Sequence, residues 1–134
     1  MNQGSANYQT LQLIYMALGG GVLLFAVIVF AVLGPLEGET DLGVLRWVWL
    51  GIALAAIFVA GLIRGRLTRD STAAQAQTVA VTTWGLAEGQ ALLGLVAYLV
   101  AGDSLPAILG LVVGVYLFAR HRPATFEPWF RTGA

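Results

Sequence analysis

The chain has 134 residues, of which 58% are hydrophobic and only 10% are charged, a balance that indicates a lipid environment and is far too apolar for an ordinary soluble domain. The length allows one domain. Seven Arg balance seven acids, so no basic surface for binding nucleic acid is expected. The absence of Cys excludes disulfides and thiolate catalysis, and the single His lacks the neighbouring ligands that a metal site needs.

Four apolar runs follow one another along the chain, and three of them reach the roughly twenty residues with which a helix crosses a bilayer. The fourth run is shorter, and no run shows the alternation that a membrane barrel strand requires. The sequence therefore predicts an all-α polytopic membrane protein, a four-transmembrane-helix up-down bundle that forms a single domain over residues 1–134. The expected spans are 12–33, 44–63, 79–101 and 105–119.

Residues that begin and end helices support these limits. Pro35 follows Gly34 and ends the first span, because proline lacks the backbone donor that a helix needs. Short polar side chains before the later spans can accept hydrogen bonds from the free amides of a first helical turn. The expected caps are Asp41 for the second helix, Thr72 with Gln75 for a third helix that begins near Ala73, and Asp103 or Ser104 for the fourth.

Arginines gather in two of the segments outside the predicted spans. The loop after the second span and the segment after the fourth hold six of the seven, and only Arg46 lies on the opposite side. Because basic residues favour the cytoplasmic side, we expect both termini in the cytoplasm, with the chain in a bacterial inner membrane. The tail, 123–134, mixes aromatic and charged residues and is expected to lie at the lipid headgroups, with partner binding as the alternative.

The third run contains Glu88, the only acid within any of the four runs. At 1.5 Å per residue, this carboxyl lies roughly 14 Å beyond Val79, near the middle of the bilayer. A carboxyl at that depth is costly, so it normally faces a protein interior. No basic residue is expected at the same depth, and we therefore expect Glu88 to be protonated and to donate a hydrogen bond to a backbone carbonyl or to a Thr or Gln side chain. The predicted proton- or ion-binding residues are Glu88, Thr83 and Gln90.

Small residues are predicted level with this carboxyl on each neighbouring helix. Small side chains let helix backbones approach closely in lipid, where the hydrophobic effect does not drive association. The residues expected to pack around the site are Gly19, Gly20, Gly21, Gly85, Gly89 and Gly110. Three roles for the acid remain open: proton or cation handling, a hydrogen-bonding latch within the bundle, and a buried contact to another subunit.

The segment Gly85-Leu86-Ala87-Glu88, followed by Gly94-Leu95-Val96 and preceded by the loop arginine Arg69, resembles the carboxylate-bearing helix of the c subunits, or proteolipids, of rotary F- and V-type ATPases. The resemblance covers 44–101. It implies a helical hairpin in which Glu88 is the proton- or sodium-binding carboxyl of a rotor. The chain departs from that family in its loop, Arg69-Asp70-Ser71, and in its first and fourth spans, which are additional. It also resembles small four-span bacterial membrane proteins with a similar acid-bearing helix.

Two functions are therefore expected. The first is a structural or accessory subunit of a membrane complex, with the bilayer and other membrane subunits or further copies of itself as partners. The second is a proton- or cation-carrying c-like subunit of a rotary ATPase or a related ion translocator. The sequence shows no nucleophile–base pair, metal cluster or phosphate-binding loop, so we expect neither enzyme activity nor a cofactor.

Overall fold

The computed structural model describes residues 3–34 and 42–131, and all regular structure in these ranges is helical. Three helices are long and apolar enough to cross a membrane, and a fourth, α4, is apolar but shorter. The prediction of an all-helical chain with several membrane-length apolar helices is confirmed. The elements are α1 (Gln3–Ile28), the π-helical turn η1 (Val29–Leu33), α2 (Leu45–Gly65), α3 (Ala73–Ala101), α4 (Ser104–Arg120), the 3-10 turn η2 (Pro123–Thr125) and α5 (Glu127–Arg131).

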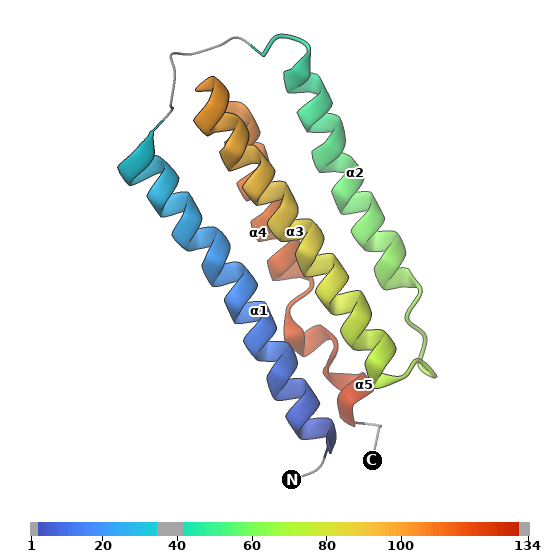
Figure 1. The fold of residues 1–134 in the computed structure, drawn as a ribbon. Helices are drawn as coiled ribbons and strands as arrows, with labels where there is room; N and C mark the ends of the chain where they lie inside the picture. Colours follow the sequence, from blue (N-terminus) through green and yellow to red (C-terminus); the bar gives the residue numbers. More distant parts are fainter. Residues whose placement is uncertain (1–2, 35–41, 132–134) are drawn as a thin grey trace.

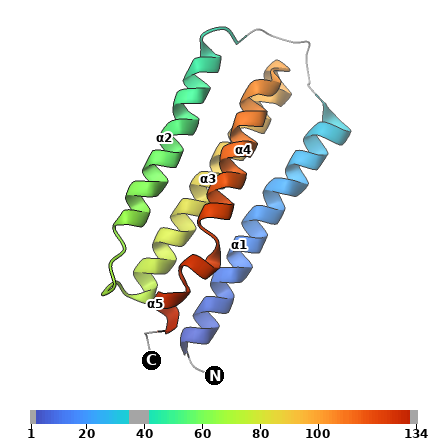
Figure 2. The ribbon, with the colours of Figure 1, turned by 180° about the vertical axis from the view of Figure 1, so that it is seen from behind.

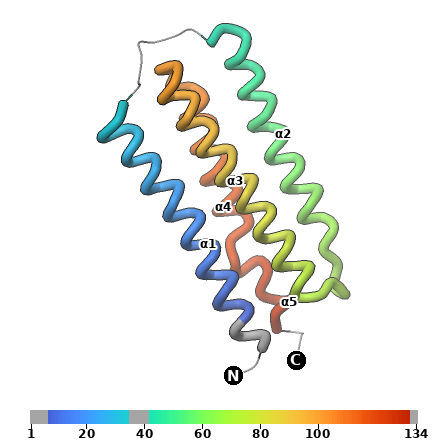
Figure 3. The backbone as a smooth tube through the Cα atoms, in the orientation of Figure 1, coloured from blue at the N-terminus to red at the C-terminus, as the bar shows by residue number. Residues whose placement is uncertain are grey.

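The long helices lie side by side, with α1 and α2 on either side of the α3–α4 pair (Figures 1 and 2). The tube in Figure 3 shows α1 and α3 rising from the end where α5 lies, whereas α2 and α4 descend toward it. We call this end the Arg-rich end. It is formed by the start of α1, the last turn of α2 with the α2–α3 turn, and residues 120–131, and it holds six of the seven arginines.

Helices α3 and α4 form the closest pair, because glycines remove the side chains at their contact. A Cβ on Gly94 would overlap the carbonyl oxygen of Pro106, and a Cβ on Gly110 would overlap that of Gln90. A Cβ on Gly114 would lie 3.0 Å from the carbonyl oxygen of Ala87. The two backbones therefore touch at three levels, and this contact fixes the position of α3 against α4.

The caps that the sequence predicted for α3 and α4 are confirmed. Thr72 accepts a hydrogen bond from the Gln75 amide at 3.2 Å, and the Gln75 side chain accepts one from the Thr72 amide at 2.8 Å. Asp103 caps α4 by accepting from the Leu105 amide at 3.0 Å. At the end of η1, Gly34 adopts a φ of 62°, which favours glycine. The expected roles of Pro35 and Asp41 lie outside the described residues.

Residues 123–131 fold back against the helices. Phe126 is fully buried and Phe130 is 5% exposed, in a cluster with Leu11 of α1 and Trp84 of α3. These rings complete an apolar core at the Arg-rich end, and the expected position of the tail at the lipid headgroups stays a prediction. The rings pack there because Leu11 and Trp84 provide an apolar surface that they cover.

Candidate functional site

Glu88 lies in the middle of α3, one turn after Trp84 and two turns before Leu95 on the same helical face. Trp84 contacts the ring of Tyr15 on α1, with centroids 5.0 Å apart. Leu95 packs in a cluster with Val29, which follows α1 directly. Because both flanking contacts are to the first helical segment, we place the Glu88 carboxyl on the side of α3 that faces α1.

Glu88 is only partly buried, and its side chain forms no hydrogen bond or ion pair with any group in the described part of the chain. The glycines beside it leave space. A Cβ built on Gly85 or on Gly89 meets no atom within 4 Å, so the tight contact expected at these two positions is not made within the described chain. These glycines lie on the flank of α3 turned away from α4, which explains the open space.

Thr83 and Gln90 do not join Glu88. With 3.6 residues per turn, they are rotated from it by about 140° and 160° around the helix axis. Both are buried on the opposite side of α3, with Thr83 fully covered and Gln90 8% exposed. The Thr83 hydroxyl donates to the carbonyl oxygen of Val79 at 2.8 Å. The three residues predicted to form one ion site are therefore divided between two faces of α3.

The glycines expected around the carboxyl are also divided. Gly110 packs against the α3 backbone, whereas a Cβ on Gly20 or Gly21 would meet no atom, and one on Gly19 would lie 3.9 Å from the ring of Phe118. Gly19 and Gly20 line an apolar groove of about 430 Å³ between α1 and α4, together with Gly114. Gly94 and Gly114, which carry the α3–α4 contact, were not identified from the sequence.

A second group of polar contacts lies at the Arg-rich end and was not predicted. Arg64, in the last turn of α2, donates to the carbonyl oxygen of Thr125 at 2.9 Å. Its guanidinium carbon lies 4.5 Å from the centroid of the Phe126 ring and 4.7 Å from that of Trp129. Trp129 in turn donates from Nε1 to the carbonyl oxygen of Thr68 at 2.7 Å. These contacts attach the tail to the end of α2.

His121 is buried where α4 ends. Only 8% of the residue is exposed to solvent. Its backbone carbonyl oxygen accepts a hydrogen bond from Nε1 of Trp84 at 2.7 Å. Burial lowers the pKa of the imidazole below its usual value, and the positive charges of Arg64 and Arg120 lower it further. The sequence predicted a structural role at the membrane interface, and the arrangement gives His121 a packed position between α3, α4 and the tail.

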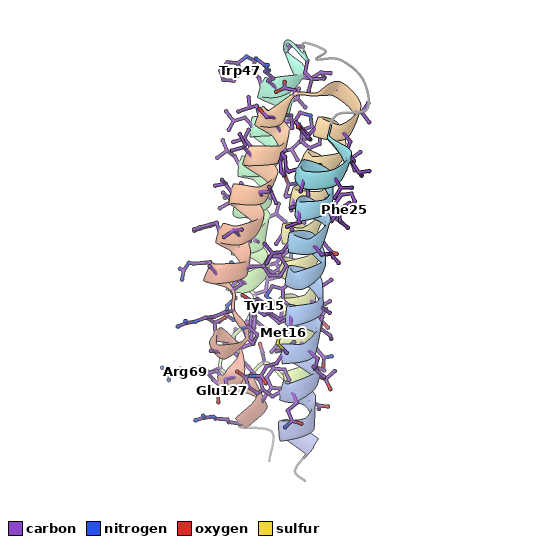
Figure 4. All side chains as sticks on the ribbon, turned by 90° about the vertical axis from the view of Figure 1, so that its left-hand side faces the viewer. Tyr15, Met16, Phe25, Trp47, Arg69 and Glu127 are labelled. Atoms are coloured by element: carbon purple, nitrogen blue, oxygen red, sulfur yellow. The ribbon has the colours of Figure 1, made fainter. Side chains whose placement is uncertain are left out.

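At the opposite end, Arg46 of α2 and Asp103 form an ion pair with 2.6 Å between Nε and Oδ2. Figure 4 shows Trp47 near this end, whereas Arg69 and Glu127 lie toward the Arg-rich end. Burial alone would raise the pKa of Asp103, but the hydrogen bonds from Arg46 and the Leu105 amide outweigh it and hold the pKa below its usual value. The pair ties α2 to the turn between α3 and α4.

The described residues contain no group of three or more His, Asp and Glu side chains gathered closely enough to hold a metal ion. Comparison of the chain with protein families, with curated proteins and with solved structures gives no match. The interpretation of the site therefore depends on Glu88 and its surroundings alone.

Proposed function

We propose that the chain is a structural or accessory subunit of a membrane complex, in which Glu88 forms its hydrogen bond with a helix from outside this chain. The observation that carries this proposal is the absence of any polar partner for Glu88 among the described residues, next to two glycines that leave space on the adjoining flank of α3, turned away from α4. An isolated carboxyl in hydrocarbon is costly, and small neighbouring residues allow another helix to approach it.

The same proposal includes the arrangement in the bilayer. We propose that α4 crosses with the other three helices in an up-down bundle, since it lies along α3 and is followed at its end by His121 and Arg122. The six arginines of one end favour placing that end, with both termini, in the cytoplasm. A bacterial inner membrane suits this orientation.

Gentle extraction followed by native mass spectrometry tests the accessory role. We expect an assembly larger than the single chain, and we expect Gly89→Leu to dissociate it by filling the space beside Glu88. The matched control is Gly61→Leu on α2, where an added Cβ likewise meets no atom. Glu88→Gln should preserve the assembly, because the amide still donates a hydrogen bond. A wild-type chain that remains monomeric in native lipids would contradict the proposal.

A second candidate is a proton- or cation-carrying subunit like the c subunits of rotary ATPases. One observation favours it: Glu88 is partly exposed at mid-helix and has no ion pair to a described residue, as exchange of a proton or cation requires. The separation of Thr83 and Gln90 from this carboxyl leaves it without the ligands expected from the sequence.

Two measurements distinguish the candidates. An ion-carrying subunit predicts that Glu88→Gln abolishes ion flux in reconstituted vesicles although assembly survives, and that a carboxyl-directed carbodiimide labels Glu88 selectively. The accessory role predicts that Glu88→Gln is tolerated in both assembly and function. A closed ring of identical chains in the mass spectrum would favour the ion-carrying subunit.

A further inference from the structure

A recess of about 360 Å³ lies at the Arg-rich end, between the end of α2 and the first turns of α3. Its polar lining is provided by Arg66, Ser71, Gln75 and Thr78, and its apolar lining includes Leu67 and Val79. Arg66 directly follows α2, whereas Val79 begins the apolar run of α3. Along α3 the lining changes from the polar Gln75 and Thr78 to the apolar Val79, the direction in which a bilayer changes from headgroup to hydrocarbon.

The guanidinium of Arg66 is available to a ligand. Arg66 is exposed, and its side chain makes no hydrogen bond or ion pair with any group that the structure describes. By contrast, Arg64 holds the tail, and Arg131 pairs with Glu127 at 2.6 Å. Asp70, the acid of the same turn, does not line the recess.

Gln75 adds a second donor. Its side-chain oxygen accepts from the Thr72 amide at 2.8 Å, which fixes the orientation of the side chain. Its Nε2 group donates to no other described residue, so both of its protons remain available. The Thr78 hydroxyl donates to the carbonyl oxygen of Ala74 at 3.0 Å and is therefore occupied.

We propose that this recess binds the phosphate of an anionic phospholipid, with Arg66 and Gln75 as donors and the acyl chains leaving past Val79 toward the apolar part of α3. A guanidinium is well suited to a phosphate, because its N–H groups form charge-assisted hydrogen bonds with the phosphate oxygens. The apolar half of the lining favours a lipid over a free phosphate ion, which would gain nothing from it. The site is independent of any role for Glu88.

Native mass spectrometry of the full chain, titrated with phosphatidylglycerol, tests the site. We expect Arg66→Gln to weaken the first lipid-binding step by about tenfold, since it removes a charge-assisted contact. Ala74→Trp should weaken binding as well, because it fills the recess without removing a charge. The hydrogen bond from Thr78 is retained, because its acceptor is the backbone carbonyl oxygen of residue 74.

The matched control is Arg69→Gln, which removes a second exposed arginine of the α2–α3 turn that does not line the recess. It should bind phosphatidylglycerol like the wild type. Equal losses in Arg66→Gln and Arg69→Gln would overturn the proposal in favour of non-specific charge attraction. Two further arms use phosphatidylcholine and inorganic phosphate alone. Weaker binding of both supports the site, whereas displacement of the lipid by inorganic phosphate at equal concentration would show a free-anion site and overturn it.

Discussion

At the scale of single residues, His121 links stability to pH. Its pKa is lowered by burial and by Arg64 and Arg120, so below the usual histidine value the unfolded chain binds a proton that the folded chain does not. Stability should therefore fall as the pH falls from about 7.5 to about 5.5, through the unperturbed histidine value. Thermal unfolding in detergent, followed by circular dichroism at both pH values, measures this loss.

The control for this prediction is His121→Gln, which keeps the backbone carbonyl that Trp84 binds and removes the titrating ring. The variant can be less stable overall, but the difference between the two pH values should shrink. Asp103 does not interfere, because its lowered pKa places its titration below this range. An unchanged pH difference in the variant would assign the effect to another group.

Asp103 supports two contacts at once, a helix cap and an ion pair. Replacing it with Ala should destabilise the chain by about 1–3 kcal/mol, because the Leu105 amide and Arg46 both lose their acceptor. Asp103→Asn should cost less, since its side-chain oxygen can still cap α4. Unfolding of the two variants side by side in detergent checks the order, and equal losses would mean that the cap contributes nothing.

The sequence predicted the position of Glu88 along its helix but not which side chains lie beside it. The length of its apolar run predicted Glu88 near the middle of a helix, and the residue lies in the middle of α3, whereas its depth in a bilayer stays a prediction. The grouping with Thr83 and Gln90 came from closeness in sequence, but residues two or five positions apart on a helix point to nearly opposite sides. The burial of Thr83 and Gln90 depends on where α4 lies, which no local pattern specifies.

At the scale of elements, the α3–α4 contact should be sensitive to a single methyl group. Gly110→Ala places a Cβ against the Gln90 carbonyl, and a backbone atom in a packed helix cannot move aside, so we expect a loss of about 1–3 kcal/mol. The measurement is thermal or denaturant unfolding of the isolated chain in detergent. The same change on α3, Gly94→Ala, meets the Pro106 carbonyl and should act similarly.

Gly89→Ala is the matched control for the glycine prediction, because it makes the same change where an added Cβ meets no atom. It should leave the stability of the isolated chain unchanged or slightly higher, since alanine is the better helix former. Equal destabilisation by Gly89→Ala and Gly110→Ala would show that helix propensity, and not close packing, determines the effect.

The ends of the helices were easier to predict from the sequence than the contacts between helices. The capping box of Thr72 and Gln75 and the cap at Asp103 depend on residues close in sequence, and both were identified correctly. The packing of the tail depends on Leu11, more than a hundred residues away from Phe126. Likewise, any glycine of α3 could have carried the close contact, and only the position of α4 selects Gly94.

At the scale of the whole molecule, charge is distributed unequally between the two ends. Six arginines lie at the end where α1 begins and α5 ends the described chain, and Arg46 is the seventh. Large apolar side chains such as Leu13, Leu23, Phe58 and Leu62 are exposed along the outer helices, as lipid contact requires. Together these features predict a fixed orientation in the membrane and not a mixture of two.

The absence of native Cys allows this orientation to be measured with single introduced cysteines. In spheroplasts, a membrane-impermeant maleimide should label Val44→Cys, since that exposed residue lies at the end opposite the arginines. Asn7→Cys and Arg69→Cys, also exposed but at the Arg-rich end, should react only after the membrane is permeabilised. The variants at the two ends control for each other, because all three cysteines must react once the membrane is permeabilised. Labelling of Asn7→Cys but not Val44→Cys in intact spheroplasts would reverse the orientation, and labelling of only one of Asn7→Cys and Arg69→Cys would contradict the up-down bundle itself.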